Sequence, residues 1–145
     1  MAKPHVVDER VVDLVRALLG GSTGRLKQYH PAVARALVYL ADHFQDKISL
    51  QDLVVHARAG RSHLSRVFRE EVGMSPMQFL ALLRVEKSKL VLADRQGSVK
   101  EAWGDSGFGD LRTLEREFKK WVGCTPIEYR QKALEQRKGS SIQDE

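Results

Sequence analysis

The sequence predicts an all-α fold with two helix-turn-helix subdomains joined by a long linker helix and preceded by an extra N-terminal helix. One reason is an internal repeat. Residues 66–79 and 116–129 share a basic segment with Phe, then Val-Gly, then Ser-Pro or Thr-Pro, then an aromatic residue. A repeat at a fixed offset indicates one structural unit used twice. The other reason is a series of helix-start signals, with no alternating apolar stretches of the kind that indicates strands.

The N-terminal region, residues 1–30, contains one predicted helix over residues 5–19 and a flexible Gly-Gly-Ser-Thr-Gly joint. The helix carries a single apolar stripe, formed by Val7, Val11, Leu14, Val15, Leu18 and Leu19. Three roles are open for this stripe: it packs on the same chain, forms a homodimer, or is the remnant of a linker. The region is too short to form a separate sensing domain.

The first subdomain is expected over residues 31–75. Its first helix begins near Pro31, because proline suits a first helical turn, where its missing N–H would be unpaired anyway. That helix has one apolar face, made of Val33, Leu37, Leu40, Ala41 and Phe44. A helix-turn-helix then follows, with its helix, turn and helix at residues 50–57, 58–60 and 61–71.

The linker helix is predicted over residues 76–93 and the second subdomain over residues 94–132. The linker has apolar side chains to bury at Phe79, Leu82, Leu83, Leu90 and Leu92. The second helix-turn-helix has its helix, turn and helix at residues 99–106, 107–109 and 110–121. Residues 133–145 form a polar tail that is expected to fray from Gln136 onward.

Four of the predicted helices start with a capping-box pattern. In this pattern a hydroxyl accepts from a backbone N–H one turn later, and the residue three positions on bonds back. The pairs are Ser49 with Asp52, Ser75 with Gln78, Ser98 with Glu101, and Thr125 with Glu128. We expect N–H groups at the helix starts of Ser49, Ser98 and Thr125 to suit phosphate groups, because helix N-termini attract anions.

Composition narrows the class of protein. A formal net charge of +5 and a pI of about 9.5 favour a polyanionic partner. The single cysteine, Cys124, excludes an internal disulfide and a multi-cysteine metal site, and it is expected in the core because it replaces Met74 of the first copy. No apolar run approaches the roughly 20 residues of a membrane span, and the N-terminus lacks the apolar block of a signal peptide. We therefore expect a soluble, cytoplasmic protein.

Motifs along the chain agree in order and spacing with one family. They include Ser62-His63-Leu64-Ser65-Arg66-Val67-Phe68-Arg69, Met74-Ser75-Pro76, Leu83-Arg84-Val85-Glu86-Lys87, Gly107-Phe108, Phe118-Lys119-Lys120 and Thr125-Pro126. Over about residues 31–132 the chain thereby resembles the DNA-binding domain of AraC/XylS-type transcription regulators. The resemblance implies two recognition helices that enter adjacent major-groove segments of double-stranded DNA. It also implies activation of transcription through contact with RNA polymerase.

The resemblance assigns outward-facing positions to the second helix of each unit. In the first unit these are Arg61, Ser62, His63, Ser65, Arg66 and Arg69, with Leu64, Val67 and Phe68 toward the core. In the second unit they are Leu111, Arg112, Thr113, Glu115, Arg116 and Lys119, with Leu114 and Phe118 inside. Arg66 and Arg116 have forked donors that match guanine O6 and N7. The hydroxyl side chains suit bases or phosphates.

Three positions depart from the family pattern. Arg58 stands where Gly is usual, which costs about 1 kcal/mol if the backbone there is left-handed. Val54 and Trp103 stand where small residues usually lie, and Trp103 follows Ala102 where the family has a large aliphatic residue and then Ala. Two explanations are open. Either large and small positions are exchanged at constant volume, or the second unit is repacked.

The two copies also differ in charge. Over residues 49–69 four arginines against Asp52 give +3, whereas over residues 99–119 four basic and five acidic residues give −1. Fewer contacts to phosphates weaken binding and flatten its salt dependence. We hypothesise that the first unit supplies most specific contacts and that the second binds loosely or meets a protein. Glu115 either accepts from a cytosine N4, repels phosphates, or holds Arg112 or Arg116.

Other function classes have less support. The five histidines lack nearby cysteines or paired acids, so no metal site and no cofactor are predicted. No Ser-His-Asp order, phosphate loop or carboxylate pair is present, so no enzyme activity is expected. A repair protein with this fold would need a reactive metal-bound cysteine, and Cys124 is expected in the core. The main alternative is an interaction module that keeps the fold and binds a protein through the acidic second unit.

Overall fold

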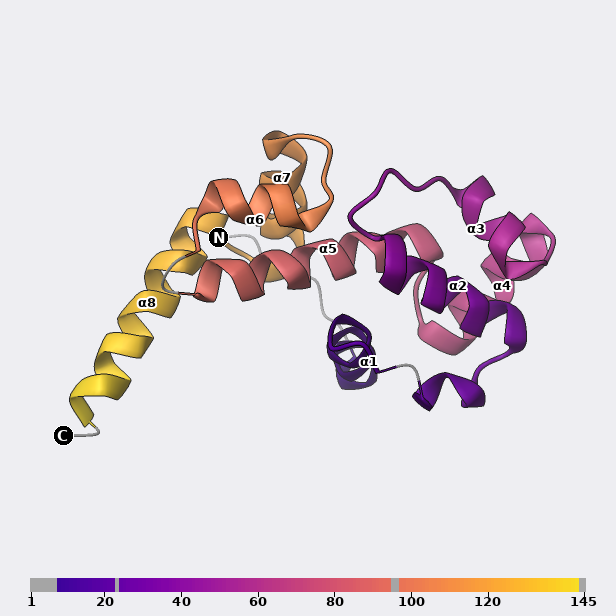
Figure 1. Cartoon of the computed structure of the whole chain (residues 1–145), viewed down its shortest axis with the longest axis horizontal. Coiled ribbons are helices and arrows are strands. Elements are labelled where there is room, and N and C mark those ends of the chain that lie inside the picture. Colours follow the sequence, from indigo (N-terminus) through magenta and orange to yellow (C-terminus); the bar gives the residue numbers. More distant parts are fainter. Residues whose placement is uncertain (1–7, 23, 95–96, 144–145) are drawn as a thin grey trace. The chain divides into compact units, whose positions relative to one another are not determined.

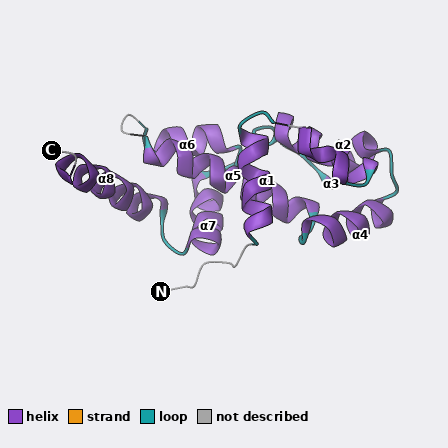
Figure 2. Ribbon diagram, turned by 90° about the horizontal axis from the view of Figure 1, so that it is seen from below, coloured by secondary structure: helices purple, strands orange, loops and turns teal. Residues whose placement is uncertain are grey.

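The computed structural model of the chain describes residues 8–22, 24–94 and 97–143. These residues form eight α-helices and one 3₁₀ helix, without a strand (Figure 1 and Figure 2). The α-helices are α1 Glu9–Leu19, α2 Pro31–His43, α3 Leu50–Ala57, α4 Arg61–Val72, α5 Pro76–Ala93, α6 Val99–Ser106, α7 Leu111–Val122 and α8 Pro126–Gln143. The all-α prediction is confirmed.

Capping residues set the start of most of these helices. At Ser49 the hydroxyl accepts from the Asp52 N–H at 3.2 Å, and the Ser49 N–H donates to the Asp52 carboxylate at 2.9 Å. The same reciprocal bonds join Ser75 with Gln78 and Thr125 with Glu128. At Ser98 the described residues show one half of the box, in which the hydroxyl accepts from the Glu101 N–H at 3.1 Å. Helices α3, α5 and α6 begin and end where predicted.

The N-terminal region differs from its prediction in two places. Helix α1 begins later than residue 5, because the Asp8 side chain accepts from the Arg10 N–H at 2.9 Å and caps the helix. The stripe position Val7 lies outside the described residues. The joint after α1 contains an unpredicted 3₁₀ helix, Gly24–Gln28, which places Leu26 in the core. A Gly-rich joint therefore contributes to packing.

Four later helix bounds also differ. Helices α4 and α7 end one residue after their predicted ends, at Val72 and Val122. Helix α7 begins one residue after the predicted start, because Asp110 is its N-cap and accepts from the Thr113 N–H at 2.7 Å. Helix α8 continues to Gln143, so the polar tail is helical there and does not fray from Gln136.

The chain divides into two compact units within α5: one ends at Arg84 and the other begins at Val85. The first half of α5 buries Phe79, Leu80, Leu82 and Leu83, and the second half buries Ser88 and Leu92. The predicted burial of Leu90 is wrong, because its side chain is 60% exposed. Since residues two apart point to different sides of a helix, α5 cannot bury Leu92 and Leu90 on the same face.

Each unit contains the same aromatic pair. The Phe68 and Phe79 rings meet edge to face, with centroids 5.9 Å apart and planes at 71°. Phe118 and Tyr129 repeat this arrangement at 5.4 Å and 71°. The residues that define the sequence repeat therefore form the same packing contact in both cores.

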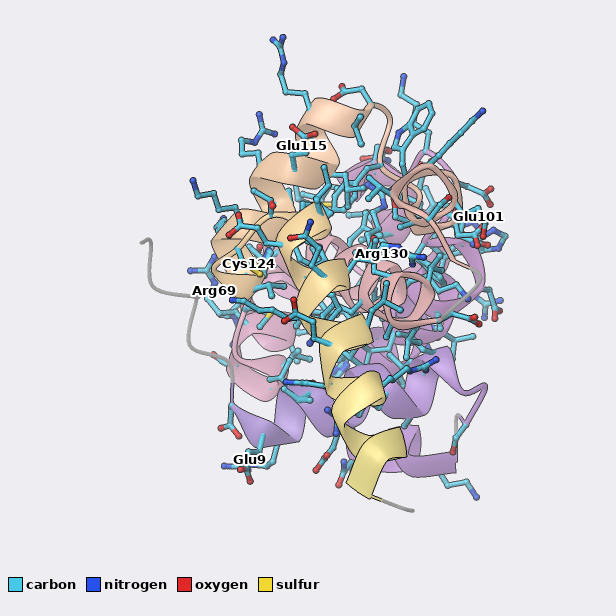
Figure 3. All side chains as sticks on the ribbon, turned by 90° about the vertical axis from the view of Figure 1, so that its left-hand side faces the viewer. Glu9, Arg69, Glu101, Glu115, Cys124 and Arg130 are labelled. Carbon is cyan, nitrogen blue, oxygen red and sulfur yellow. The ribbon has the colours of Figure 1, made fainter. Side chains whose placement is uncertain are left out.

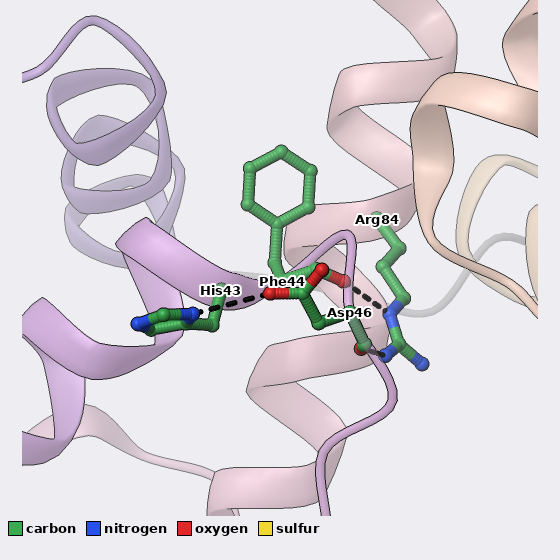
Figure 4. A network of polar contacts seen from close by, with 4 residues as sticks. All are labelled: His43, Phe44, Asp46 and Arg84. Carbon is green, nitrogen blue, oxygen red and sulfur yellow. Dashed lines mark hydrogen bonds and ion pairs between the residues drawn. The ribbon is translucent and has the colours of Figure 1, made fainter.

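An arginine from the last helix of the first unit holds the end of α2. Arg84 Nε donates to the Phe44 carbonyl at 2.8 Å, and one terminal nitrogen donates to the Asp46 carbonyl at 2.8 Å (Figure 4). The Asp46 carboxylate lies 3.1 Å from His43 Nδ1. Desolvation by burial lowers the pKa of Arg84. These bonds supply donors to carbonyl groups that a helix end leaves unpaired.

The second unit uses an arginine in the same way. Arg130 of α8, labelled in Figure 3, donates to the carbonyls of Leu92 and Asp94, each at 3.2 Å. These carbonyls lie at the C-terminal end of α5. In both units an arginine of the last helix therefore holds the C-terminal end of the helix that precedes the helix-turn-helix.

Helix α1 packs within the first unit. Its residues Val11, Leu14, Val15 and Leu18 are buried, and α1 contacts α2. The structure thereby favours packing on the same chain among the three roles considered for this stripe. A stripe that is already covered offers little apolar surface to a second copy.

Candidate nucleic-acid interface

The turn before α4 places a non-glycine residue in a left-handed backbone conformation. Arg58 has φ 57° and ψ 43°, and its N–H donates to the Val54 carbonyl at 3.1 Å. In the second unit Gly107 ends α6 with φ 92°. Left-handed conformations cost little for Gly and more for residues with a Cβ. The left-handed backbone at Arg58 therefore costs folding free energy in the first unit, as expected. The second unit avoids this cost because Gly107 stands at the end of α6.

Helix α4 exposes the predicted positions. Arg61, Ser62, His63, Arg66 and Arg69 are exposed, and Ser65 is half-buried. Leu64 and Phe68 are fully buried, and Val67 is 8% exposed. Figure 3 labels Arg69, whose side chain extends from the ribbon. Each turn of α4 thus offers cationic and hydroxyl groups on one face and apolar groups on the other.

The start of α4 has no side-chain cap. Its N-cap is Gly60, so no side chain of that residue accepts from the first N–H groups of the helix. Beside it, an Arg61 terminal nitrogen donates to Gln51 Oε1 of α3 at 3.3 Å. A helix N-terminus with unpaired N–H groups and a neighbouring cation attracts anions such as phosphate.

Arg66 contacts two side chains of its own helix. One terminal nitrogen lies 3.3 Å from His63 Nδ1, and the other lies 3.5 Å from Glu70 Oε1. The Arg66 and Glu70 side chains are 63% and 61% exposed. Exposed ion pairs stabilise a fold by little, so the main consequence of these contacts is the placement of the guanidinium.

Helix α7 exposes its predicted positions too. Leu111, which is 41% exposed, lies with Arg112, Glu115, Arg116 and Lys119 on the surface, and Thr113 is half-buried. Leu114 and Phe118 are fully buried. Figure 3 labels Glu115 on this helix. Among the described residues Glu115 forms no ion pair with Arg112 or Arg116, so the expected local pairing is not seen.

The start of α7 differs from that of α4. The Asp110 carboxylate accepts from the Thr113 N–H at 2.7 Å. The pKa of Asp110 is lowered, chiefly by this backbone hydrogen bond and further by the charges of Arg116 and Arg112. A negative charge of the protein therefore lies where an approaching phosphate would need to bind.

Two of the three helix starts expected to suit phosphates, those at Ser49 and Thr125, already hold protein groups. The Ser49 N–H donates to Asp52, and the Thr125 N–H donates to Glu128. The pKa of Asp52 is lowered mainly by the backbone hydrogen bond of Ser49, and that of Glu128 mainly by the Thr125 side chain. These two carboxylates are therefore held in the ionised form. In this respect α4 differs from both α3 and α8.

The two α6 residues that depart from the family pattern, Ala102 and Trp103, differ in burial. Leu53 and the matching Ala102 are both fully buried, whereas Trp103 is half-buried. Among the described residues, the buried Trp103 Nε1 has no hydrogen-bond partner. Nearby, the fully buried Ser106 hydroxyl donates to the Trp103 carbonyl at 2.9 Å and accepts from the Phe108 N–H at 3.2 Å. The position that Leu53 occupies in the first unit and Ala102 in the second is therefore buried in both units.

Residues 53–132, more than half of the chain, match a family described as a helix-turn-helix domain. The chain belongs to the AraC-type helix-turn-helix family. The predicted resemblance is therefore confirmed.

Two curated relatives show how much of a longer protein this AraC-type chain matches. An uncharacterised HTH-type transcriptional regulator of Staphylococcus aureus is 32% identical over 92 residues, which cover 63% of this chain and 12% of that protein. The arabinose operon regulatory protein of Escherichia coli K12 is 29% identical over 99 residues, which cover 68% and 34%. The matched region is about an eighth of the first relative and about a third of the second.

A solved structure with the same fold contains DNA. The DNA-binding domain of AdpA, described as a global transcriptional factor, was solved in complex with a target DNA. It matches this AraC-type chain with a TM-score of 0.69 and 26% identity, over 74% of this chain and 97% of that one.

No group of three or more His, Cys, Asp or Glu side chains in the described ranges is placed to hold a metal ion. None of the described helices has the length and apolar character needed to cross a membrane. Cys124 is buried, as expected.

Three features of this surface were missed in the sequence. Gln51 holds Arg61, Asp110 caps α7, and Glu70 approaches Arg66. The pair of Arg66 and Glu70 was detectable, because residues four apart lie side by side on a helix. The contact of Gln51 with Arg61 joins α3 and α4. The only sequence feature that indicates it is the predicted tight turn that brings these two helices together.

Proposed function

We propose that this chain is the DNA-binding part of a sequence-specific transcription regulator, with residues 31–132 as the DNA-binding domain. The exposed cationic face of α4, with a helix start that no side chain caps, carries the proposal. Unpaired N–H groups suit a phosphate and fix register, and Arg66 offers the forked donors that a guanine accepts. The match to a domain solved with target DNA supports this function.

The two recognition helices have unequal roles in this proposal. Helices α4 and α7 enter adjacent major-groove segments, and α4 supplies most of the specific contacts. This inequality is supported by the carboxylate of Asp110 at the start of α7 and by Glu115 on its exposed face. Both groups repel phosphates, whereas Arg61, Arg66 and Arg69 on α4 attract them.

Selection of bound sequences from random DNA tests the proposal. We expect a two-part site with half-sites about one helical turn, or roughly 34 Å, apart. A single short half-site would mean that one helix reads alone. Equal affinity for selected and random DNA over a range of salt concentrations would contradict sequence-specific binding.

We also propose that the output is activation, through contact with RNA polymerase, in the cytoplasm at the nucleoid. The match to an operon regulatory protein supports a role at promoters. Transcription in vitro from a promoter with the selected site measures the output directly. More transcript with the protein than without it is expected, and less transcript would identify a repressor.

One observation favours a second candidate function, an interaction module that binds a protein through the second unit. Helices α5 and α6 border a hollow of about 500 Å³ whose lining includes exposed Leu90, three acidic residues, Asp94, Glu101 and Asp105, and one basic residue, Lys87. Such a surface suits a basic partner with an apolar anchor. Salt-dependent gel shifts separate the two functions, because an interaction module shows no preference for promoter DNA over random DNA.

A further inference from the structure

The guanidinium of Arg66 is held between two acceptors on α4. One terminal nitrogen lies 3.3 Å from His63 Nδ1, and the other lies 3.5 Å from Glu70 Oε1. Arginine has five N–H donors and no acceptor, so His63 Nδ1 must accept in this contact and must carry no proton. Each terminal nitrogen keeps one further N–H. The Nε–H and at least one N–H on each terminal nitrogen therefore remain for a guanine while the two contacts restrain Arg66.

The His63 ring is itself supported by the start of α2. Its ring meets that of His30 edge to face, with centroids 5.3 Å apart and planes at 72°. His30 is fixed twice: its Nδ1 accepts from the Ala32 N–H at 3.1 Å, and its own N–H donates to both oxygens of Glu71 at 2.9 and 3.0 Å. A continuous series of contacts thus runs from the N-cap of α2 to Arg66.

The matching positions of α7 lack these acceptors. Thr113 and Lys120 stand fifty residues after His63 and Glu70, where they flank Arg116. Lysine cannot accept a hydrogen bond, and Arg116 forms no ion pair with any described residue. The restraint is therefore particular to the first unit.

We infer that His63 is a positioning residue for Arg66 and that its neutral form is needed for full discrimination between bases. This inference rests on the proposed function. An arginine that is ordered before binding loses less side-chain freedom when it binds. A protonated His63 cannot accept from Arg66 and repels it, which leaves only Glu70. The groups that face His63 are Arg66 and His30, with Glu70 and Glu71 as their partners.

Lower pH therefore lowers the discrimination between bases and raises the affinity for any DNA. When His63 gains a proton, Arg66 is released and discrimination falls. The added positive charge on His63 meanwhile strengthens binding to any DNA through the phosphates. If His63 only contacted a phosphate, both specific and random DNA would bind more tightly and their ratio would stay constant.

The test uses the full chain, its selected DNA site and the same site with one base pair changed. The base pair to change is one that Arg66 reads. Changing it lowers the DNA affinity of the unaltered chain and leaves the DNA affinity of Arg66→Ala the same. The ratio of the two affinities is measured at about pH 8 and pH 5.5. For the unaltered chain we expect this ratio to fall by about two- to ten-fold at the lower pH.

Variants of His63 separate positioning from a merely structural role. His63→Asn keeps an acceptor oxygen in place of Nδ1 and should hold a high ratio at both pH values. His63→Leu should have a low ratio at both. His56→Leu is the matched control, because the His56 ring stacks on Tyr39 at 4.1 Å and belongs to α3. This control should keep the pH profile of the unaltered chain.

The outcomes distinguish this inference from the proposed function. If Arg66→Ala loses discrimination while His63→Leu keeps the ratio and pH profile of the unaltered chain, the inference is wrong and the DNA-binding function stands. If no DNA sequence is bound better than random DNA, the proposed function fails and this inference fails with it. Circular dichroism of each variant confirms folding, which is expected because His63 is exposed.

Discussion

The two recognition helices have nearly the same buried side and different exposed sides. Leu64 and Phe68 of α4 match Leu114 and Phe118 of α7, and all four are fully buried. On the surface, the N-cap of α4 is Gly60, which has no side chain to accept a hydrogen bond. The N-cap of α7 is Asp110, whose carboxylate accepts one. Burial thus constrains one side of each helix, because a core tolerates few changes of volume. The exposed side is free to diverge, and there the two units differ in charge.

The largest expected effect tests whether the two cores are equivalent. Phe68→Ala and Phe118→Ala should each lower the free energy of unfolding by about 3–5 kcal/mol, because each ring is fully buried. Each ring also meets one aromatic partner edge to face. Denaturant unfolding followed by circular dichroism measures both losses. A difference of more than about 2 kcal/mol between them would contradict the equivalence of the cores.

The next effect tests the unequal reading surfaces. Arg66→Ala should cost about 1–3 kcal/mol of binding free energy on the selected DNA site. Arg116→Ala should cost less than about 1 kcal/mol, because Asp110 and Glu115 already weaken the approach of α7 to DNA. Fluorescence anisotropy at one fixed salt concentration measures both. Equal losses would show that the two helices contribute alike.

A smaller effect concerns the turns. Arg58→Gly should raise the free energy of unfolding by up to about 1 kcal/mol, because the backbone at Arg58 is left-handed. Gly107→Ala should lower it by about 1 kcal/mol for the same reason. Denaturant unfolding measures both, with Arg58→Ala as the control that removes the charge and keeps the Cβ. Stabilisation by Arg58→Ala equal to that by Arg58→Gly would assign the effect to charge.

The smallest effect is a pH dependence that the N-cap of α7 has and the N-cap of α4 lacks. The folded-state pKa of Asp110 is lowered, so its contribution to stability is complete above the unfolded-state value of about 4 and is lost as pH falls through the folded-state value. Asp110→Asn keeps a capping oxygen without the titration. Thermal unfolding midpoints between neutral and acidic pH should therefore fall more steeply in the unaltered chain than in this variant. Parallel curves would contradict the assignment.

Local signals explain why most helices could be predicted. The partners of Ser49, Ser75 and Thr125 lie three residues away, so the pattern that starts each helix is visible in a short window. The exposed positions of α4 and α7 were assigned by the resemblance to the AraC/XylS-type family. Whether those positions contact DNA stays a prediction, because that depends on a partner molecule.

Contacts between distant residues explain most of what could not be predicted. Arg84 and Arg130 bond to carbonyls that lie 36–40 residues away, and no local pattern marks such partners. The error at Leu90 has a related cause. Leu90 and Leu92 were both expected to be buried, whereas the two halves of α5 serve two cores and the second half buries Leu92 alone of this pair. The capping role of Asp110 was missed because the helix was predicted to begin at that residue.

The continuity of α5 across the boundary at Arg84 and Val85 has a consequence for hydrogen exchange. A helical amide is released to solvent only when its own turn opens. Amides near the boundary are supported by packed turns on both sides, so the opening of one unit leaves them anchored by the other. Their exchange should therefore be slower than that of amides at either end of α5. Exchange of these amides therefore requires both cores to unfold.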